Sequence, residues 1–235
     1  MTPFDGFGQI ACIHYAPDAD RMPGIDAELR RVGILPAENF RWHVTARWPA
    51  FDFAFVAARS CGARTEKTAA QWCCLTAHQQ IVRAALLSGC RTLLVLEDDV
   101  RFLRDAGEAR RIVASWDPAE FDICLFDAFP WKRGRAVAGR PFVAFDRGVM
   151  GASCYALNRA GMQAVCDACD EAMRGRTEIL MSDVAIDRAK CRKAYTARFA
   201  CVQKDFPRQM NGDVFGVTSG AAYRRLGIDT GDYNL

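Results

Sequence analysis

The strongest constraint on the fold is an apolar run, Leu93 to Leu96, which follows a long helical pattern and ends in three acids, Glu97-Asp98-Asp99. A short apolar run of this kind is typical of a buried strand. The helical pattern covers Thr68 to Ser88, where apolar residues recur at helical spacing, and Gly89 ends it. Helices that alternate with buried strands are typical of α/β proteins, so the sequence predicts that class.

The same alternation extends over much of the chain. Strands are predicted at Gln9–Tyr15, Phe40–Val44, Thr92–Leu96, Phe121–Phe126, Val149–Leu157 and Ala194–Val202. Further helices are predicted at Ile25–Val32, Ala106–Trp116, Asn158–Arg174, where Asn158 is the N-cap, and Met181–Lys190, with a basic loop at Trp131–Arg140. We therefore expect an α/β sandwich with a mostly parallel central sheet, in a single domain over residues 1–235 with a less regular tail from about residue 210.

Composition excludes several classes of protein. The 235 residues are 51% hydrophobic, which is enough for a core, and the net charge of +3 is too small to indicate a nucleic-acid partner. No apolar run is long enough to cross a membrane and no secretory leader is visible. We expect a cytoplasmic protein, with at most peripheral contact at the inner face of the membrane.

The 11 cysteines are an odd number and several lie in apolar stretches. Reduced, buried thiols explain this pattern better than a disulfide framework does. Cys166 and Cys169 have Cys-x-x-Cys spacing, but no second pair follows them. A structural role is therefore expected for the cysteines rather than a metal-binding one.

The three acids at the strand end need a physical explanation, because buried charge is costly unless it is paired or bound to a metal. In an extended segment Glu97 and Asp99 would share one face and Asp98 would point the other way. Two carboxylates on one face suit Mg²⁺ or Mn²⁺, and such a metal suits a diphosphate. Asp99 is the first candidate ligand, Glu97 the second, and Asp98 a structural residue. The alternative is a strand that simply ends in solvated acids.

Other candidate residues have two interpretations each. His78 lies on the helix before the acidic strand, where it either contacts a ligand or fills a structural role. Asp183, at the start of a predicted helix, is either a helix-start acid or a general base. Asp127, at the end of another predicted strand, is the competing base. The basic segment Trp131–Arg135 is either a lid over phosphates or a solvated loop.

Several nucleotide-binding and hydrolase motifs are absent from the sequence. It has no Gly-x-x-x-x-Gly-Lys-Ser/Thr phosphate loop, no Gly-x-Gly-x-x-Gly after the first strand and no Gly-x-Ser-x-Gly elbow. P-loop NTPases and dinucleotide dehydrogenases are therefore disfavoured.

Ordered motifs along the chain resemble glycosyltransferase family 25, a GT-A-type family associated with lipopolysaccharide biosynthesis and collagen galactosylation. The best match is Leu93 to Val100, which resembles that family's Leu-Ile-Leu-Glu-Asp-Asp block. Weaker matches are Ile13-His14-Tyr15 with Asp18 and Arg21, Cys74-Leu75-Thr76-Ala77-His78, Cys154 to Gly161, Asp183 and Gln203. The sequence departs from the family pattern at His14-Tyr15, Ala77, Met181 and Arg208.

The resemblance implies a GT-A-like (Rossmann-type) α/β/α fold and an inverting transferase with Mn²⁺ or Mg²⁺. It implies transfer of a hexose of galactose or glucose type from a UDP-sugar to a glycan or glycolipid acceptor, as in lipopolysaccharide or other surface polysaccharide synthesis. Asp183 then becomes the better candidate base. The donor-site candidates are His14, Tyr15, Arg21, His78, Glu97 and Asp98, and the metal ligands are Asp99 and Glu97.

Two alternatives to a glycosyltransferase come from other functional classes. A non-catalytic module on the same fold would bind a glycan or a partner enzyme without turnover. A nucleotidyltransferase would use the acids for a triphosphate, but the glycine-rich basic loop expected after its first strand is missing.

Overall fold

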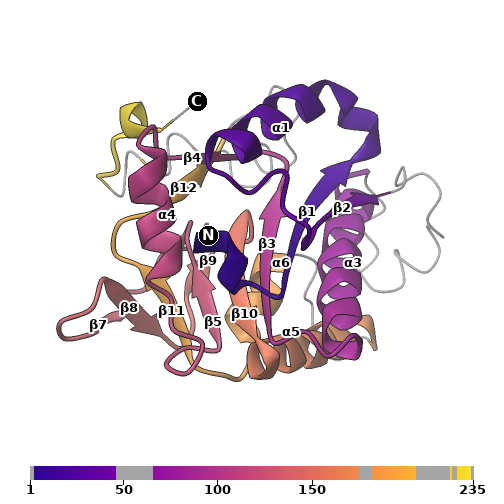
Figure 1. Ribbon diagram of the computed structural model, residues 1–235. Coiled ribbons are helices and arrows are strands. Elements are labelled where there is room, and N and C mark those ends of the chain that lie inside the picture. Colours follow the sequence, from indigo (N-terminus) through magenta and orange to yellow (C-terminus); the bar gives the residue numbers. More distant parts are fainter. Residues whose placement is uncertain (1–2, 46–65, 175–181, 205–222, 224–226, 234–235) are drawn as a thin grey trace.

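A computed structural model of the chain describes residues 3–45, 66–174, 182–204, 223 and 227–233 (Figure 1). The helices are α1 (Met22–Arg31), α3 (Glu66–Leu87), α4 (Ala106–Ala114), α5 (Arg159–Met173) and α6 (Ser182–Arg188), with 3-10 turns η1 (Pro3–Gly6), η2 (Ala16–Arg21) and η4 (Thr230–Asp232). The main-sheet strands are β1 (Gln9–Tyr15), β2 (Phe40–Thr45), β3 (Thr92–Glu97), β5 (Ile123–Leu125), β7 (Arg135–Ala136), β8 (Phe142–Phe145), β10 (Cys154–Asn158) and β11 (Lys193–Thr196). Two small sheets pair β4 (Val100–Phe102) with β12 (Cys201–Gln203), and β6 (Phe129–Pro130) with β9 (Val149–Met150).

The main sheet has eight strands in the order β2-β1-β3-β10-β5-β11-β8-β7. Strand β1 is parallel to both β2 and β3, and β5 is parallel to β11. Strands β10 and β8 run against their neighbours. Most strands therefore share one direction, which confirms the predicted α/β class with a mostly parallel central sheet.

Helices cover both faces of this sheet. The connection from β1 through α1 leads to β2 at the edge of the sheet. The connection from β2 through α3 runs in the opposite direction and leads to β3, on the other side of β1. Because such crossovers are right-handed, α1 and α3 lie on opposite faces. Helices α3, α5 and α6 contact one another.

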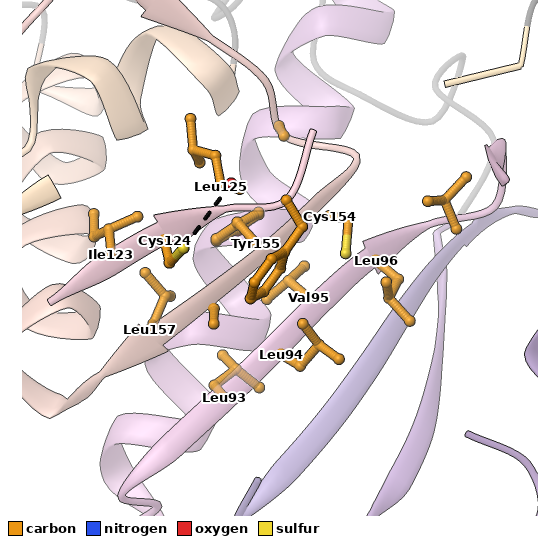
Figure 2. Packing of buried hydrophobic residues seen from close by; sticks show 14 of the residues in the cluster. Leu93, Leu94, Val95, Leu96, Ile123, Cys124, Leu125, Cys154, Tyr155 and Leu157 are labelled. Atoms are coloured by element: carbon orange, nitrogen blue, oxygen red, sulfur yellow. Dashed lines mark hydrogen bonds between the residues drawn. The ribbon is translucent and has the colours of Figure 1, made fainter. Parts of the chain in front are cut away.

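The core centres on β3 and its neighbour β10 (Figure 2). Leu96 pairs with Cys154 and Val95 pairs with Tyr155 in antiparallel register, and all four side chains are buried. Both faces of β3 are covered, which explains why its sequence is a continuous apolar run and not an alternating one.

Two predicted strands are wrong in extent, because each divides between two sheets. The segment Val149–Leu157 forms β9 and β10, separated by Gly151, whose φ of 146° is a conformation that other residues rarely adopt. The segment Ala194–Val202 forms β11 in the main sheet and β12 against β4. Between them lies the charged Arg198, which reaches Glu108 at 3.2 Å.

The other predicted elements agree with the structure to within a few residues, but strands β4, β6 and β8 were not predicted, and the predicted loop Trp131–Arg140 contains the edge strand β7. The N-cap at Asn158 is confirmed, since its Oδ1 accepts from the Gly161 amide at 2.9 Å. Arg208 lies outside the described residues, and so does most of the predicted tail from about residue 210. Within the described part of the chain, no helix has the length and apolarity needed to cross a membrane.

Strands β1, β3 and β5 point the same way, so their carboxyl ends meet at one edge of the sheet. Strand β1 ends at Tyr15 and β3 ends at Glu97, and Asp127 comes shortly after the end of β5. Strand β10 runs the other way, so its first residues, after Ser153, lie at the same edge. The fold therefore collects polar side chains from distant segments where ligands of α/β proteins usually bind.

Candidate functional site

The three acids after β3 contact three different parts of the molecule. The strand ends at Glu97, and the chain turns at Asp98 and Asp99 before β4 begins. The alternation expected of an extended segment therefore stops at Glu97. Glu97 reaches α3, Asp98 reaches β1 and η2, and Asp99 reaches β12.

Asp98 is buried and contacts two basic side chains, those of His14 and Arg21. Its Oδ2 lies 2.7 Å from His14 Nδ1 and accepts from the Tyr15 amide at 3.4 Å, and its Oδ1 accepts from the Arg21 guanidinium at 3.1 Å. Because an ionised carboxylate only accepts hydrogen bonds, His14 donates through Nδ1. Asp98 thus ties the end of β1 to the turn after β3, the structural role expected of it. In this arrangement His14, Tyr15 and Arg21 hold Asp98 in place.

Glu97 ends a chain of hydrogen bonds that begins in the core. Its Oε1 lies 2.9 Å from His78 Nε2, and His78 Nδ1 lies 2.7 Å from the Tyr155 hydroxyl. Since the carboxylate accepts, His78 donates through Nε2, and its Nδ1 shares the second hydrogen bond with the Tyr155 hydroxyl. The Cys74 thiol also donates to Glu97 Oε1, at 3.6 Å, and lies 3.5 Å from Ser182 Oγ. His78 therefore orients Glu97 through both of its ring nitrogens.

Asp99 is buried and accepts from the Gln203 side-chain amide at 2.8 Å. Burial raises the pKa of the Asp99 carboxyl well above its usual range, and the charges of Glu97 and Asp98 raise it further. The hydrogen bond from Gln203 lowers that pKa and so opposes this effect. Asp99 is therefore a carboxyl group whose ionised form needs positive charge nearby.

Glu97 and Asp99 both offer oxygen ligands of the kind that a divalent cation prefers, although their side chains contact different parts of the fold, α3 and β12. Mg²⁺ and Mn²⁺ prefer oxygen ligands, and the carboxyl groups of Glu97 and Asp99 supply them. The repulsion that raises the pKa of Asp99 is the kind that a bound cation offsets. Asp98 is a poorer ligand, because Arg21 and His14 already occupy both of its oxygens.

Asp127 is a second buried carboxyl group at the same edge. Its oxygens accept hydrogen bonds from the hydroxyls of Ser153 and of Tyr223, the latter at 2.6 Å. Burial raises the pKa of Asp127 to about 6, an effect that these two hydrogen bonds oppose. With both oxygens engaged and 1% of the residue exposed, Asp127 is poorly placed to meet a substrate hydroxyl.

Asp183 lies in the first turn of α6 and is only partly buried. Its Oδ1 accepts from the Val184 amide at 2.8 Å. Burial raises the pKa of Asp183 to about 7, with a further increase from the charge of Glu97. Asp183 is thus a more accessible carboxyl group than Asp127, with a pKa suited to accepting a proton near neutral pH.

The structure brings the predicted site residues to one edge of the sheet and adds four hydroxyl-bearing residues that sequence reasoning missed. Tyr155 orients His78, Ser182 contacts Cys74, and Ser153 and Tyr223 hold Asp127. Tyr223 lies 96 residues from Asp127 in the chain, and no local pattern in the sequence marks such a pair.

Comparisons with known proteins find distant similarities only. No protein-family model and no curated protein matches the chain. Among solved structures, a mannose-1-phosphate geranyltransferase from Thermus thermophilus is 16% identical, with a TM-score of 0.45, over 83% of this chain and 75% of that one. A UDP-glucose pyrophosphorylase complexed with UDP-glucose is 11% identical, also with a TM-score of 0.45, over 92% of this chain and 81% of that one.

Proposed function

We propose that the chain is a metal-dependent inverting glycosyltransferase resembling family 25. It would move a hexose from a UDP-sugar to a hydroxyl of a glycan or glycolipid, as in the synthesis of lipopolysaccharide or another surface polysaccharide. The observation that carries the proposal is the position of Asp183. Burial and the charge of Glu97 raise the pKa of this partly exposed carboxyl group to about 7, and it lies near the edge of the sheet where ligands of α/β proteins usually bind.

Each step of the proposed reaction has a residue assigned to it. Asp183 takes the proton of the acceptor hydroxyl, whose oxygen bonds to the anomeric carbon as the bond to UDP breaks. Attack opposite the departing UDP inverts that carbon. Asp99 and Glu97 would hold Mg²⁺ or Mn²⁺, which when bound supplies positive charge for the diphosphate.

The surrounding contacts support a preorganised donor site. His78 and Tyr155 orient Glu97, and Gln203 orients Asp99. Asp98, fixed by Arg21 and His14, sets the turn on which the neighbouring acids stand. Side chains held in this way lose little conformational freedom when a ligand binds.

Donor binding is the first test of the proposal. UDP with Mn²⁺, at 100 times its dissociation constant, should stabilise the folded protein by about 2.7 kcal/mol, which raises the melting temperature measurably. Asp99→Asn should abolish the shift. Asp146→Asn removes the same charge at an exposed position between β8 and β9 and should retain it. A folded wild-type protein that shows no shift would contradict the proposal.

Sugar transfer is the second test. UDP-, GDP- and CMP-sugars should be screened for metal-dependent hydrolysis, with UDP-hexoses expected to react fastest. The opposite result is a protein that binds UDP or a glycan and yet neither releases UDP from any donor nor transfers sugar to any acceptor. That result would favour the alternative, a non-catalytic glycan- or partner-binding module.

A further inference from the structure

Two side chains of α3 and one of β3 form a compact cluster. Cys74 and His78 are four residues apart in one helix, so their side chains lie on the same face. Glu97 at the end of β3 meets both of them, at 3.6 Å from the thiol sulfur and 2.9 Å from His78 Nε2. All three ligand atoms lie within 4.8 Å of one another.

These separations are close to those around a tetrahedral zinc ion. Bonds of about 2.3 Å to sulfur and about 2.0 Å to nitrogen or oxygen put neighbouring ligand atoms roughly 3.3–3.6 Å apart. The cluster therefore needs separations to change by at most about 1.3 Å to close on a metal. A thiolate, an imidazole and a carboxylate are ligands typical of Zn²⁺, whereas Mg²⁺ prefers oxygen alone.

The surroundings of the cluster also suit a metal. The Tyr155 hydroxyl lies 2.7 Å from His78 Nδ1, the position at which metal-binding histidines usually have a hydrogen-bond partner. Ser182 Oγ lies 3.5 Å from the Cys74 sulfur. Glu97 has a side chain that is 18% exposed and Cys74 is partly exposed, so an ion can enter from solvent.

We propose that Cys74, His78 and Glu97 form a binding site for a thiophilic transition metal of the Zn²⁺ class. Binding converts the Cys74 thiol to a thiolate and releases its proton to solvent. The proton on His78 Nε2 moves to Nδ1, which then donates to the Tyr155 oxygen. Three protein ligands leave a fourth position for water or a substrate atom, as in catalytic rather than structural zinc sites.

Cobalt titration tests this site without any activity assay, and so does not depend on the proposed transferase. Co²⁺ added to the untagged, metal-free, reduced protein should give a thiolate-to-cobalt absorption band in the near ultraviolet that saturates at one equivalent per chain. Added Zn²⁺ should then displace the cobalt and remove the band.

Variants identify the ligands. Cys74→Ser should lose the band, whereas Cys73→Ser, which removes the adjacent buried thiol outside the cluster, should keep it. Tyr155→Phe should retain the band with about 10–100-fold weaker affinity. The melting temperature of each metal-free variant confirms that it is folded.

Two results would overturn the proposal. One is the absence of a cobalt band in the folded wild-type protein. The other is an unchanged band in Cys74→Ser, which would assign the thiolate to another cysteine. Asp99→Asn separates this proposal from the transferase, because it should abolish stabilisation by UDP and Mn²⁺ while keeping the cobalt band.

Discussion

Strand β5 has an aspartate just outside each end, and the two have opposite electrostatic environments. Asp122, before the strand, accepts from the Arg192 guanidinium at 2.7 Å and from the Asn158 amide at 2.9 Å. These contacts lower the pKa of Asp122 to about 2, and the hydrogen bond from the Arg192 side chain makes the largest contribution. Asp127, after the strand, accepts only from hydroxyl groups among the described residues, and burial raises its pKa to about 6.

The difference separates an aspartate that stabilises the fold through a cation from one that is buried without such a pair among the described residues. A carboxylate that is paired with a cation stabilises the fold at neutral pH. A buried carboxyl group without such a pair destabilises the fold when it ionises, and such groups are concentrated at functional sites. Asp183, with a pKa of about 7, resembles Asp127 in this respect. Asp98 also pairs with a cation, Arg21, although it lies at the carboxyl end.

Asp183→Asn is expected to have the largest effect. Loss of a general base lowers the rate of transfer by about 10²–10⁴-fold, while stabilisation by UDP and Mn²⁺ should be unchanged. Radiolabelled-sugar transfer and thermal shift measure the two quantities. Asp127→Asn is the matched control, and it should reduce transfer less. If Asp127→Asn alone abolished transfer, the two assignments would be exchanged.

Asp98→Asn should cause the largest loss of stability. It leaves the Arg21 guanidinium, whose side chain is 12% exposed, without its buried ionised partner. Breaking a buried pair of this kind lowers the free energy of unfolding by about 3 kcal/mol. Urea denaturation measures the loss, and Asp146→Asn serves as the exposed control. A loss below about 1 kcal/mol would show that Asp98 is not a structural anchor.

Asp127→Asn should change how stability depends on pH. The pKa of Asp127 in the folded state, about 6, exceeds the ordinary value of about 4, so the folded state binds a proton more readily. The contribution of Asp127 to the free energy of unfolding therefore falls by roughly 2–3 kcal/mol as pH rises from about 4 to 6. The variant should be stabilised relative to wild type at pH 7 more than at pH 4. Melting temperatures at the two pH values measure this, and parallel curves would contradict it.

Asp122→Asn should have the smallest effect and the opposite dependence on pH. The pKa of Asp122 is lowered to about 2, so its stabilisation is present above about pH 4 and disappears as pH falls through 2. The loss at pH 7 should be at most about 1 kcal/mol, because the Arg192 side chain is 57% exposed and water screens the pair. Acid-induced unfolding followed by circular dichroism should show wild type and variant converging at low pH.

The sequence predicted the regular elements best where one periodic signal ran without interruption. Strand β1 was predicted at Gln9–Tyr15, as observed, and α3 differs from its predicted bounds by only a few residues. Prediction was wrong where one apolar stretch divides between two sheets, as at Val149–Leu157. An apolar pattern records that a residue is buried, but it does not record which strand covers it.

The candidate site was predictable in its acids and not in its partners. Glu97, Asp98 and Asp99 stand out because three charges follow a buried strand. Their different roles depend on contacts across the fold. His14 lies 84 residues from Asp98, and Gln203 lies 104 residues from Asp99.

Hydrophobic periodicity and charge are local properties of the chain, so they were sufficient to predict the α/β class, the buried strand β3 and the position of three acids after it. Which carboxyl groups meet cations and which meet hydroxyls depends on contacts between distant segments of the chain. Asp98 is paired with Arg21, while Asp127 is held by Ser153 and Tyr223. Burial and the nearest charge set a carboxyl group's pKa, and both depend on segments that only the fold brings together.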